Sequence, residues 1–415
     1  MSPILKSYVK TSAASFAAAG VIIAFAAVAG LFLPFAAAAF VLLFAAIVVI
    51  MVGTIGIAGA AVSYREVRAQ RGEEDLFLSL NRSRDRSALE QSRPARHSRL
   101  RRRLARRLLG HDLLVGDVVE VKSWEEISKT LDAAGRFEEV PFLPEMFAMC
   151  GQRARVFRCM HRLFDYRKSR KMRHMDGGVL LVGAVCDGSH HGGCEAACHT
   201  IWKSEWLRRI DPRTGDANRS VAAVSAAPEQ LQSGTQAPFF ACQLTQLQAA
   251  SRPVVDRKVS TFMMPVVAGN VTLSAFVIGW LTHIFNQVQT RRGGVTFPAF
   301  AEPRPGDSEY SEQSLKVGET VLVRSSGQIR STLNDQLMHR GMWFEPDMLK
   351  HCNQPRTVQS EIRKLIDIVT GEMRTMKTPA YILRDVHFSG ERQLFNSQYE
   401  PLFWRAAWLQ RRDDA

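Results

Sequence analysis

The hydrophobic positions of this chain change their spacing along its length. Residues 11–63 contain no charged residue and form an apolar run far longer than the about 20 residues that cross a bilayer. A break near Pro34 predicts a tight turn between two apolar helices, over 12–32 and 36–61. The pattern therefore predicts a transmembrane helical hairpin over 1–62.

Further along, apolar and polar residues alternate, as they do in half-buried strands. The stretches "VVEVKS" and "TVLVRS" follow Gly116 and Gly318, and each predicts a strand. Ser123 is followed three residues later by Glu126, a capping-box spacing that predicts a short helix. The segment "DGGVLLVGAVC" predicts a turn and then a buried strand that runs into Cys186.

The alternating segments belong to an internal repeat with an offset of 202 residues. The matched positions are Gly116/Gly318, Val119/Val321, Val121/Val323, Ser123/Ser325, Ile127/Ile329, Leu131/Leu333, Phe142/Phe344, Pro144/Pro346, Met146/Met348, Cys150/Cys352, Trp202/Trp404 and Trp206/Trp408. The predicted fold class is α+β, with the transmembrane hairpin followed by two small, homologous, β-barrel-like repeats. We expect them at 112–211 and 315–415, packed as a pseudo-twofold pair through their tryptophan segments.

A connecting region over 212–314 separates the repeats. It begins with a Pro-, Gly- and Ser-rich linker and then carries an uncharged stretch over 262–286, long enough for a third span. Arg291 and Arg292 follow that stretch, and a third crossing would place them on the wrong side of a membrane. We therefore favour an amphipathic or interfacial helix over 272–288, capped by Asn270 or Thr272.

Charge changes this picture between the hairpin and the first repeat. The net charge is +14, and fourteen arginines against six acids fall within 63–111. "RLRRRLARRLLG" places Leu100, Leu104 and Leu108 on one helical face, which predicts a juxtamembrane helix on anionic lipid headgroups. The headgroup-binding residues are predicted to be Arg99, Arg101, Arg102, Arg103, Arg106 and Arg107. Nucleic acid is disfavoured as a partner, because no aromatic platform or nucleic-acid motif accompanies the arginines.

The charges that flank the hairpin predict its orientation. Lys6 and Lys10 precede the first apolar helix, and Arg65 and Arg68 follow the second. Positive residues stay on the cytoplasmic side, so both ends of the hairpin are predicted to face the cytoplasm. The expected location is the bacterial inner membrane, with two spans and the bulk of the chain cytoplasmic.

Candidate chemistry gathers in "VCDGSHHGGCEAACH", residues 185–199. Its cysteines have the spacing C-x7-C-x3-C, and an odd total of seven cysteines favours metal binding over a disulfide framework. A closed tetrahedral zinc site needs a fourth ligand, which we assign to Cys150. The predicted ligands are Cys150, Cys186, Cys194 and Cys198, with His190, His191, His199 and Cys242 as reserves. The second repeat has Phe388, Asn396 and Glu400 where the first has the three clustered cysteines, so the metal is expected in the first repeat.

Three other interpretations stay open. The letters "CDGSH" match the core of the CDGSH iron–sulfur family, whose upstream C-x-C pair this chain lacks, and cysteines can ligate an iron–sulfur cluster of another kind. A cysteine nucleophile would need a lowered pKa and an oriented base. An enzyme would need a pocket between the repeats, with Asp187, His190 or His191 as acid–base groups.

The motifs together resemble an uncharacterised bacterial two-repeat cysteine-motif family, marked by CDGSxHGGCxxxC and a downstream tryptophan. The resemblance rests on "GDVVEVKSWEEISKTLDAAGRFEEVPFLPEM", "CDGSHHGGCEAACHTIWKSEWLRR", "ACQLTQL" and "GNVTLSAF", and spans about 112–412. The resemblance implies that the gene lies near genes for cell-surface polysaccharides, and it implies no particular activity. We therefore expect a membrane-anchored accessory or scaffold protein with a structural zinc site, serving an envelope pathway with protein partners. The alternatives are an iron–sulfur redox protein and an enzyme.

Overall fold

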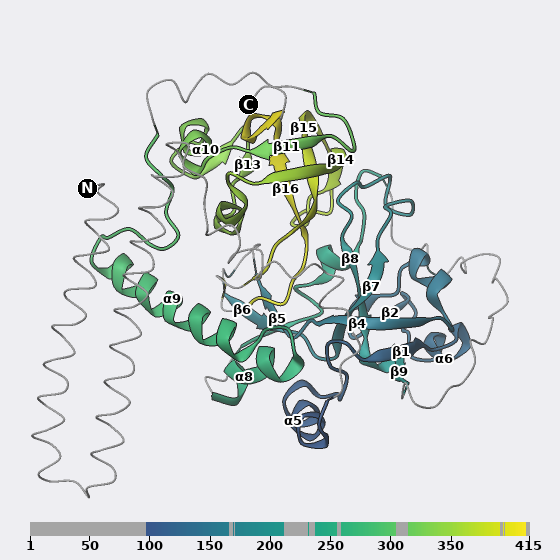
Figure 1. The fold of residues 1–415 in the computed structure, drawn as a ribbon. Coiled ribbons are helices and arrows are strands. Elements are labelled where there is room, and N and C mark those ends of the chain that lie inside the picture. Colours follow the sequence, from purple (N-terminus) through teal and green to yellow (C-terminus); the bar gives the residue numbers. More distant parts are fainter. Residues whose placement is uncertain are drawn as a thin grey trace, which may run out of the picture. The chain divides into compact units, whose positions relative to one another are not determined.

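The computed structural model describes residues 97–165, 169, 171–210, 231, 237–254, 259–303, 314–390, 393 and 395–411 (Figure 1). The chain divides into two compact units. Among the described residues, the larger comprises those within 97–276, 314–323 and 355–411, and the smaller comprises those within 277–303 and 324–354. Both five-stranded sheets and the candidate site lie in the larger unit.

The predicted fold class and membrane location require correction. Among the residues that the structure describes, no helix is both long and apolar enough to cross a membrane. These residues form mostly strands in antiparallel sheets, with few helices. The hairpin predicted over 1–62 lies outside the described residues. Since no described helix can cross a membrane, the structure does not support the predicted two-span inner-membrane location.

The first repeat forms an antiparallel five-stranded sheet in the order β8-β7-β4-β1-β9. Its strands are β1 (Val118–Val121), β4 (Arg153–Cys159), β7 (Gly178–Val185), β8 (His199–Lys203) and β9 (Leu207–Arg209). The two edge strands are joined by the single 3-10 turn η2 (Ser204–Trp206). Three residues reach about 10 Å at most, whereas the edges of a flat five-stranded sheet lie about 19 Å apart. The sheet must therefore curl strongly.

The second repeat forms a sheet of the same order, β16-β15-β14-β11-β17 (Figure 1). Its strands are β11 (Thr320–Val323), β14 (Pro355–Ile366), β15 (Met373–His387), β16 (Pro401–Arg405) and β17 (Leu409–Arg411), with the 3-10 turn η5 (Ala406–Trp408) before the last. The registers also agree, because Val121 lies opposite Leu207 and Val323 lies opposite Leu409. The two sheets therefore occupy equivalent positions of the internal repeat.

Shorter elements complete the larger unit. These are α5 (Arg99–Leu109), α6 (Trp124–Ser128), β2 (Arg136–Phe137), β3 (Val140–Pro141), η1 (Pro144–Met149), β5 (Arg162–Phe164), β6 (Met172–His174), α7 (Gln243–Gln246), β10 (Arg252–Pro253) and α8 (Val259–Ala268). The predicted capping box is confirmed, since the Ser123 hydroxyl accepts from the Glu126 backbone N–H and the Glu126 carboxylate accepts from the Ser123 N–H.

The smaller unit holds α10 (Ser326–Thr332), β12 (Met338–His339), β13 (Met342–Trp343) and η4 (Pro346–His351). Helix α9 (Leu273–Arg291) begins near the predicted residue, and the Thr272 hydroxyl accepts from the Ala275 N–H at its start. The predicted helix and its threonine cap are confirmed. Its interfacial role stays a prediction.

An aromatic cluster forms the core of the first repeat. Phe142 packs against Trp124, Trp202 and Trp206, with ring centroids 5.7, 6.0 and 5.2 Å away. The Trp206 indole N–H donates to the Thr130 hydroxyl at 3.0 Å, so its polar end is satisfied. These tryptophans pack inside their own repeat, whereas we expected them between the repeats.

The two repeats instead meet through their loops, by reciprocal contacts. Ser397 of the second repeat donates its backbone N–H to Arg162 O and accepts from the Arg162 N–H through its hydroxyl. At the equivalent positions, Glu195 of the first repeat donates to Lys364 O and accepts from the Lys364 N–H through its carboxylate. Reciprocal pairs of this kind are the mark of twofold-related partners. The loop with the candidate ligands is therefore part of the interface between the repeats.

Helix α5 differs from the predicted lipid-binding helix in the residues that it buries. Ala105 and Leu109 are buried, whereas Leu100 and Leu104 are 76% and 41% exposed. Arg101 donates to the carbonyls of Val266 and Val267, which end α8. The exposed arginines are Arg99, Arg103, Arg106 and Arg107. Arg101, which was predicted to bind headgroups, therefore attaches α5 to α8.

Arg102 makes the deepest of these anchors and gives a stability prediction. Its guanidinium forms a two-pronged ion pair with Asp117, 2.8 Å for each prong, and Asp117 is only 4% exposed. We expect Arg102→Ala to lower the free energy of unfolding by about 3–5 kcal/mol, because it leaves a buried carboxylate unpaired. Urea denaturation measures this. Arg103→Ala, on the exposed side of the same helix, should stay within about 0.5 kcal/mol of the wild type. Equal effects of the two variants would contradict the assignment.

Candidate metal centre

The cysteine-rich loop connects two paired strands. Val185 at the end of β7 lies opposite His199 at the start of β8. The Cys186 N–H then donates to Cys198 O at 2.8 Å and closes the loop at its base. Between these points the chain has only turns and irregular structure, so the loop holds its shape through local hydrogen bonds and tight turns.

Gly188 is the tightest of these turns. Its φ is +72°, and a Cβ atom there would lie 1.9 Å from the Cys194 carbonyl oxygen. The Gly188 carbonyl accepts from the His191 N–H at 2.9 Å, and the His191 carbonyl accepts from the Cys194 N–H at 3.2 Å. These two hydrogen bonds turn the His191 side chain inward, where it is 3% exposed, and leave the neighbouring His190 exposed.

Three ligand types converge beneath this loop. Ligand atoms of Glu145, Cys186 and His191 all lie within 4.8 Å of one another. Glu145 comes from η1, and its side chain is 9% exposed. Its carboxylate lies 3.4 Å from the His191 Nε2 atom, which is too long for a charge-assisted hydrogen bond. Carboxylate, thiolate and imidazole are all zinc ligands.

The polar atoms of this group are buried without hydrogen-bond partners. Both ring nitrogens of His191 and both carboxylate oxygens of Glu145 have none among the described residues. A buried polar group that is left unpaired costs about 1–3 kcal/mol. A cation bound between these atoms would satisfy them, so the donor set fits a metal ion. Glu145, Cys186 and His191 therefore form a candidate metal-binding group.

The electrostatics of the group separate metal binding from nucleophilic catalysis. Burial and then the Glu145 carboxylate raise the pKa of the Cys186 thiol. Burial opposes ionisation of Glu145 itself, but His191 and Cys186 beside it hold the pKa of that carboxyl below its usual value. A nucleophilic cysteine needs a lowered pKa, so Cys186 does not have the properties of one. A bound cation would displace the thiol proton instead.

Only two of the predicted ligands and reserves belong to this three-residue group. Cys186 and the reserve His191 belong to the group, and Glu145 was missed. The sequence held a signal for it, because both repeats carry an acid at this position, Glu145 and Asp347. Cys150, our predicted fourth ligand, instead packs in the hydrophobic core, where burial raises the pKa of its thiol to about 11.

The remaining predicted ligands lie outside this three-residue group. His199 stacks on Phe157, with ring centroids 5.8 Å apart, and contacts Tyr399 of the second repeat. Burial lowers the pKa of His199 to about 4. The side chains of Cys194, Cys198 and Cys242 are half-buried near the same loop. The exposed His190 takes no part in the group.

The glycines of the loop give a matched pair of variants. We expect Gly188→Ala to abolish metal binding, because the new Cβ atom would collide with the Cys194 carbonyl oxygen. Gly193 also has a positive φ, +76°, but a Cβ atom there meets nothing within 4 Å. Gly193→Ala should therefore cost only the about 1–2 kcal/mol of the left-handed conformation and keep the metal. Metal content and thermal unfolding of both variants test this, and equal metal loss would show that backbone strain alone explains the effect.

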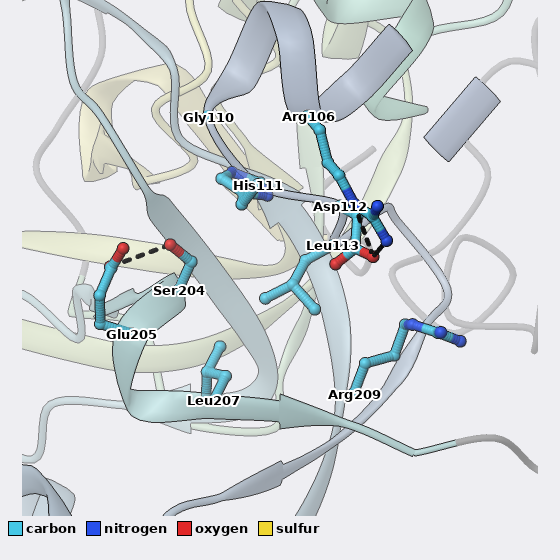
Figure 2. A pocket seen from close by; sticks show the side chains of 9 residues that line it. All are labelled: Arg106, Gly110, His111, Asp112, Leu113, Ser204, Glu205, Leu207 and Arg209. Carbon is cyan, nitrogen blue, oxygen red and sulfur yellow. Dashed lines mark hydrogen bonds and ion pairs between the residues drawn. The ribbon is translucent and has the colours of Figure 1, made fainter. Parts of the chain in front are cut away.

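Neither cavity described in the structure adjoins the candidate centre. The larger, of about 290 Å³, is lined by Arg106, Gly110, His111, Asp112, Leu113, Ser204, Glu205, Leu207 and Arg209 (Figure 2). Its lining holds two arginines and two acids, and Arg106 pairs with Asp112 at 2.8 Å. This balance favours neither an anion nor a cation.

The other cavity lies between Leu163 of the first repeat and Gln398 of the second and measures about 30 Å³. Such a volume holds about one or two waters. It does not supply the substrate pocket between the repeats that the enzyme interpretation requires.

Comparisons with family models, curated proteins and solved structures find no match to this chain, so its function is argued from the site itself.

Proposed function

We propose that this chain is an accessory or scaffold protein whose first repeat is stabilised by a bound zinc ion. The proposed ligands are the carboxylate of Glu145, the thiolate of Cys186 and the imidazole of His191. The observation that supports the proposal is their convergence, within 4.8 Å and without hydrogen-bond partners for the imidazole or carboxylate among the described residues. Zinc suits the mixture of sulfur, nitrogen and oxygen donors.

Burial supports a structural role over a catalytic one. Three protein ligands with an open fourth position are also typical of catalytic zinc. A catalytic ion must be reached by substrate, however, and the side chains of His191 and Glu145 are 3% and 9% exposed. Neither cavity described above is lined by any of the three ligands. The proposed ion therefore ties the loop to η1, two elements some forty residues apart in sequence.

Metal analysis of the protein, purified without an affinity metal, tests the proposal. We expect about one equivalent of zinc or more per chain. Cys186→Ser and His191→Ala should lose zinc from this site. His190→Ala is the matched control, because it changes the adjacent, exposed histidine and should keep the wild-type content. A metal-free wild type would refute the proposal, and iron with sulfide would replace zinc by an iron–sulfur cluster.

The partner of this scaffold is proposed from its charge. Arg99, Arg103 and Arg107 are exposed along α5, and they support binding to a polyanion such as anionic lipid headgroups. The family resemblance adds envelope polysaccharide production as the proposed setting. Co-sedimentation with vesicles that contain or lack anionic lipid tests the headgroup proposal, with the triple alanine variant of these arginines as the control.

A further inference from the structure

Two leucines project from the outer side of helix α5, beside the arginines that the proposed function uses. Leu100 is 76% exposed, the highest value for any large hydrophobic side chain among the described residues, and Leu104 is 41% exposed. They lie four residues apart, so they are neighbours on one face of the helix. Scattered single leucines are ordinary on a protein surface, whereas this adjacent pair presents one continuous apolar strip to water.

Exposed arginines surround the pair of leucines. With 3.6 residues per helical turn, Arg103 and Arg107 fall on the same face as the leucines, and Arg99 lies at the edge of that face. All three arginines are exposed. The outer face of α5 is therefore mixed, with two apolar side chains among three cationic ones.

The inner side of α5 attaches the helix to the fold and fixes this face outward. Ala105 and Leu109 are buried. Leu108, which was predicted to lie on the same stripe as the two leucines, instead packs against the core. The Arg101 guanidinium donates to two carbonyls at the end of α8, at 2.9 and 2.7 Å. The structure therefore divides the predicted leucine stripe between the core and the surface.

Both ends of α5 are also capped. The Ser98 hydroxyl accepts from the Arg101 N–H at 3.2 Å, and Gly110 ends the helix with a φ of +80°. The outer face is thus formed before any partner binds. A preformed face avoids the ordering cost that a flexible segment incurs on binding.

We infer that α5 lies in the interface of an anionic bilayer, with the side chains of Leu100 and Leu104 inserted at the acyl boundary. Arg99, Arg103 and Arg107 then contact the headgroups. This inference rests on the anionic-lipid part of the proposed function and names the bilayer itself as the ligand. Helices with apolar and cationic side chains distributed in this way lie in the plane of the interface. Arginine suits the flanking positions, because its methylene stem covers apolar surface while its guanidinium reaches a phosphate.

The two leucines favour a bilayer over a soluble polyanion. Nucleic acid and polyphosphate bind arginines through charge, and an exposed leucine adds nothing to that interaction. Helix α5 also contains no aromatic residue on which a base could stack. A bilayer, in contrast, removes an inserted leucine from water and gains affinity from it.

Co-sedimentation with vesicles tests the inference, with inorganic polyphosphate as the soluble polyanion. The vesicles consist of phosphatidylcholine alone or of equal parts of phosphatidylcholine and phosphatidylglycerol. We expect Leu100→Ala with Leu104→Ala to lower the affinity for the anionic vesicles by at least about tenfold, because most of each inserted side chain is removed. The affinity for polyphosphate should stay unchanged. The triple alanine variant of the arginines should weaken both interactions, that with the vesicles by about a hundredfold.

Two further variants control for general effects of the substitutions. Val317→Ala with Val369→Ala removes apolar side chains that are 68% and 47% exposed outside α5, and it should keep the wild-type affinity for vesicles. Leu100→Met with Leu104→Met keeps two apolar side chains on good helix formers and should keep most of that affinity. Equal unfolding temperatures show that each variant has folded.

The outcomes separate this inference from the proposed function. Vesicle binding that depends on the arginines but not on the leucines would overturn the insertion and leave the headgroup proposal. Binding to polyphosphate but not to anionic vesicles would overturn both, in favour of a soluble polyanion such as nucleic acid. Binding to neither would also overturn both. If the leucine variant loses polyphosphate as well as vesicles, the leucines act through the helix and the inference is wrong.

Discussion

Chelation of the bound metal should lower the unfolding temperature of the wild-type protein by about 8–16 °C. A ligand present at about a thousand times its dissociation constant adds about 4 kcal/mol to the free energy of unfolding. Each kcal/mol shifts the midpoint of a large domain by about 2–4 °C. The effect is large because the metal joins the loop that begins at Cys186 to η1, and because this loop contacts the second repeat through Glu195.

Differential scanning calorimetry with and without a chelator measures this shift. A variant that lacks the proposed site, Cys186→Ser, should unfold at the temperature of the chelated wild type and show no further change with chelator. Gly193→Ala should keep the full difference, because its loop is expected to keep the metal. An unfolding temperature of the wild type that does not respond to a chelator, in protein shown to contain zinc, would contradict a structural role.

Replacement of Phe142 by alanine should have the largest effect of any single core substitution proposed for this chain. Phe142 is 2% exposed and lies among three tryptophan rings, with the nearest centroid 5.2 Å away at Trp206. Truncation of a buried phenylalanine costs about 3–5 kcal/mol, and each lost aromatic pair adds about 0.5–1.5 kcal/mol. Chemical denaturation should therefore show a loss of at least about 4.5 kcal/mol in the free energy of unfolding, the lower sum of the truncation and the three aromatic pairs.

Two variants calibrate this prediction. Phe142→Leu keeps most of the volume and should cost less than the alanine variant. Phe239→Ala removes a ring that is 56% exposed and should change the stability little. If Phe142→Ala costs no more than Phe239→Ala, the aromatic cluster is not the centre of the first repeat.

Local signals in the sequence were sufficient for the elements of the repeats. Alternation after Gly116 and Gly318 predicted β1 and β11, and both are strands with alternating burial. The capping box at Ser123 depends only on residues three positions apart, and it was confirmed. In these cases the responsible contacts lie within a few residues, so spacing alone carries the information.

The hairpin that hydropathy predicted over 1–62 lies outside the described residues, and no helix among those residues is long and apolar enough to span a membrane. The amphipathic reading of α5 shows the limit of local signals. Its periodicity identified a helix, but the choice of buried face depends on Asp117 and α8, which lie elsewhere in the chain.

The sequence by itself determined the internal repeat, the principal strands, the short capped helix and the concentration of metal-binding residue types in one loop. Only the tertiary structure decided which of these residues meet. Glu145 joins Cys186 and His191 because η1 passes beneath the loop, and Cys150, five residues further on, turns into the core. Ser397 meets Arg162 and Glu195 meets Lys364 because the two repeats exchange reciprocal contacts. Spacing along the chain predicts local geometry, whereas ligand sets depend on packing between distant segments, which no local pattern encodes.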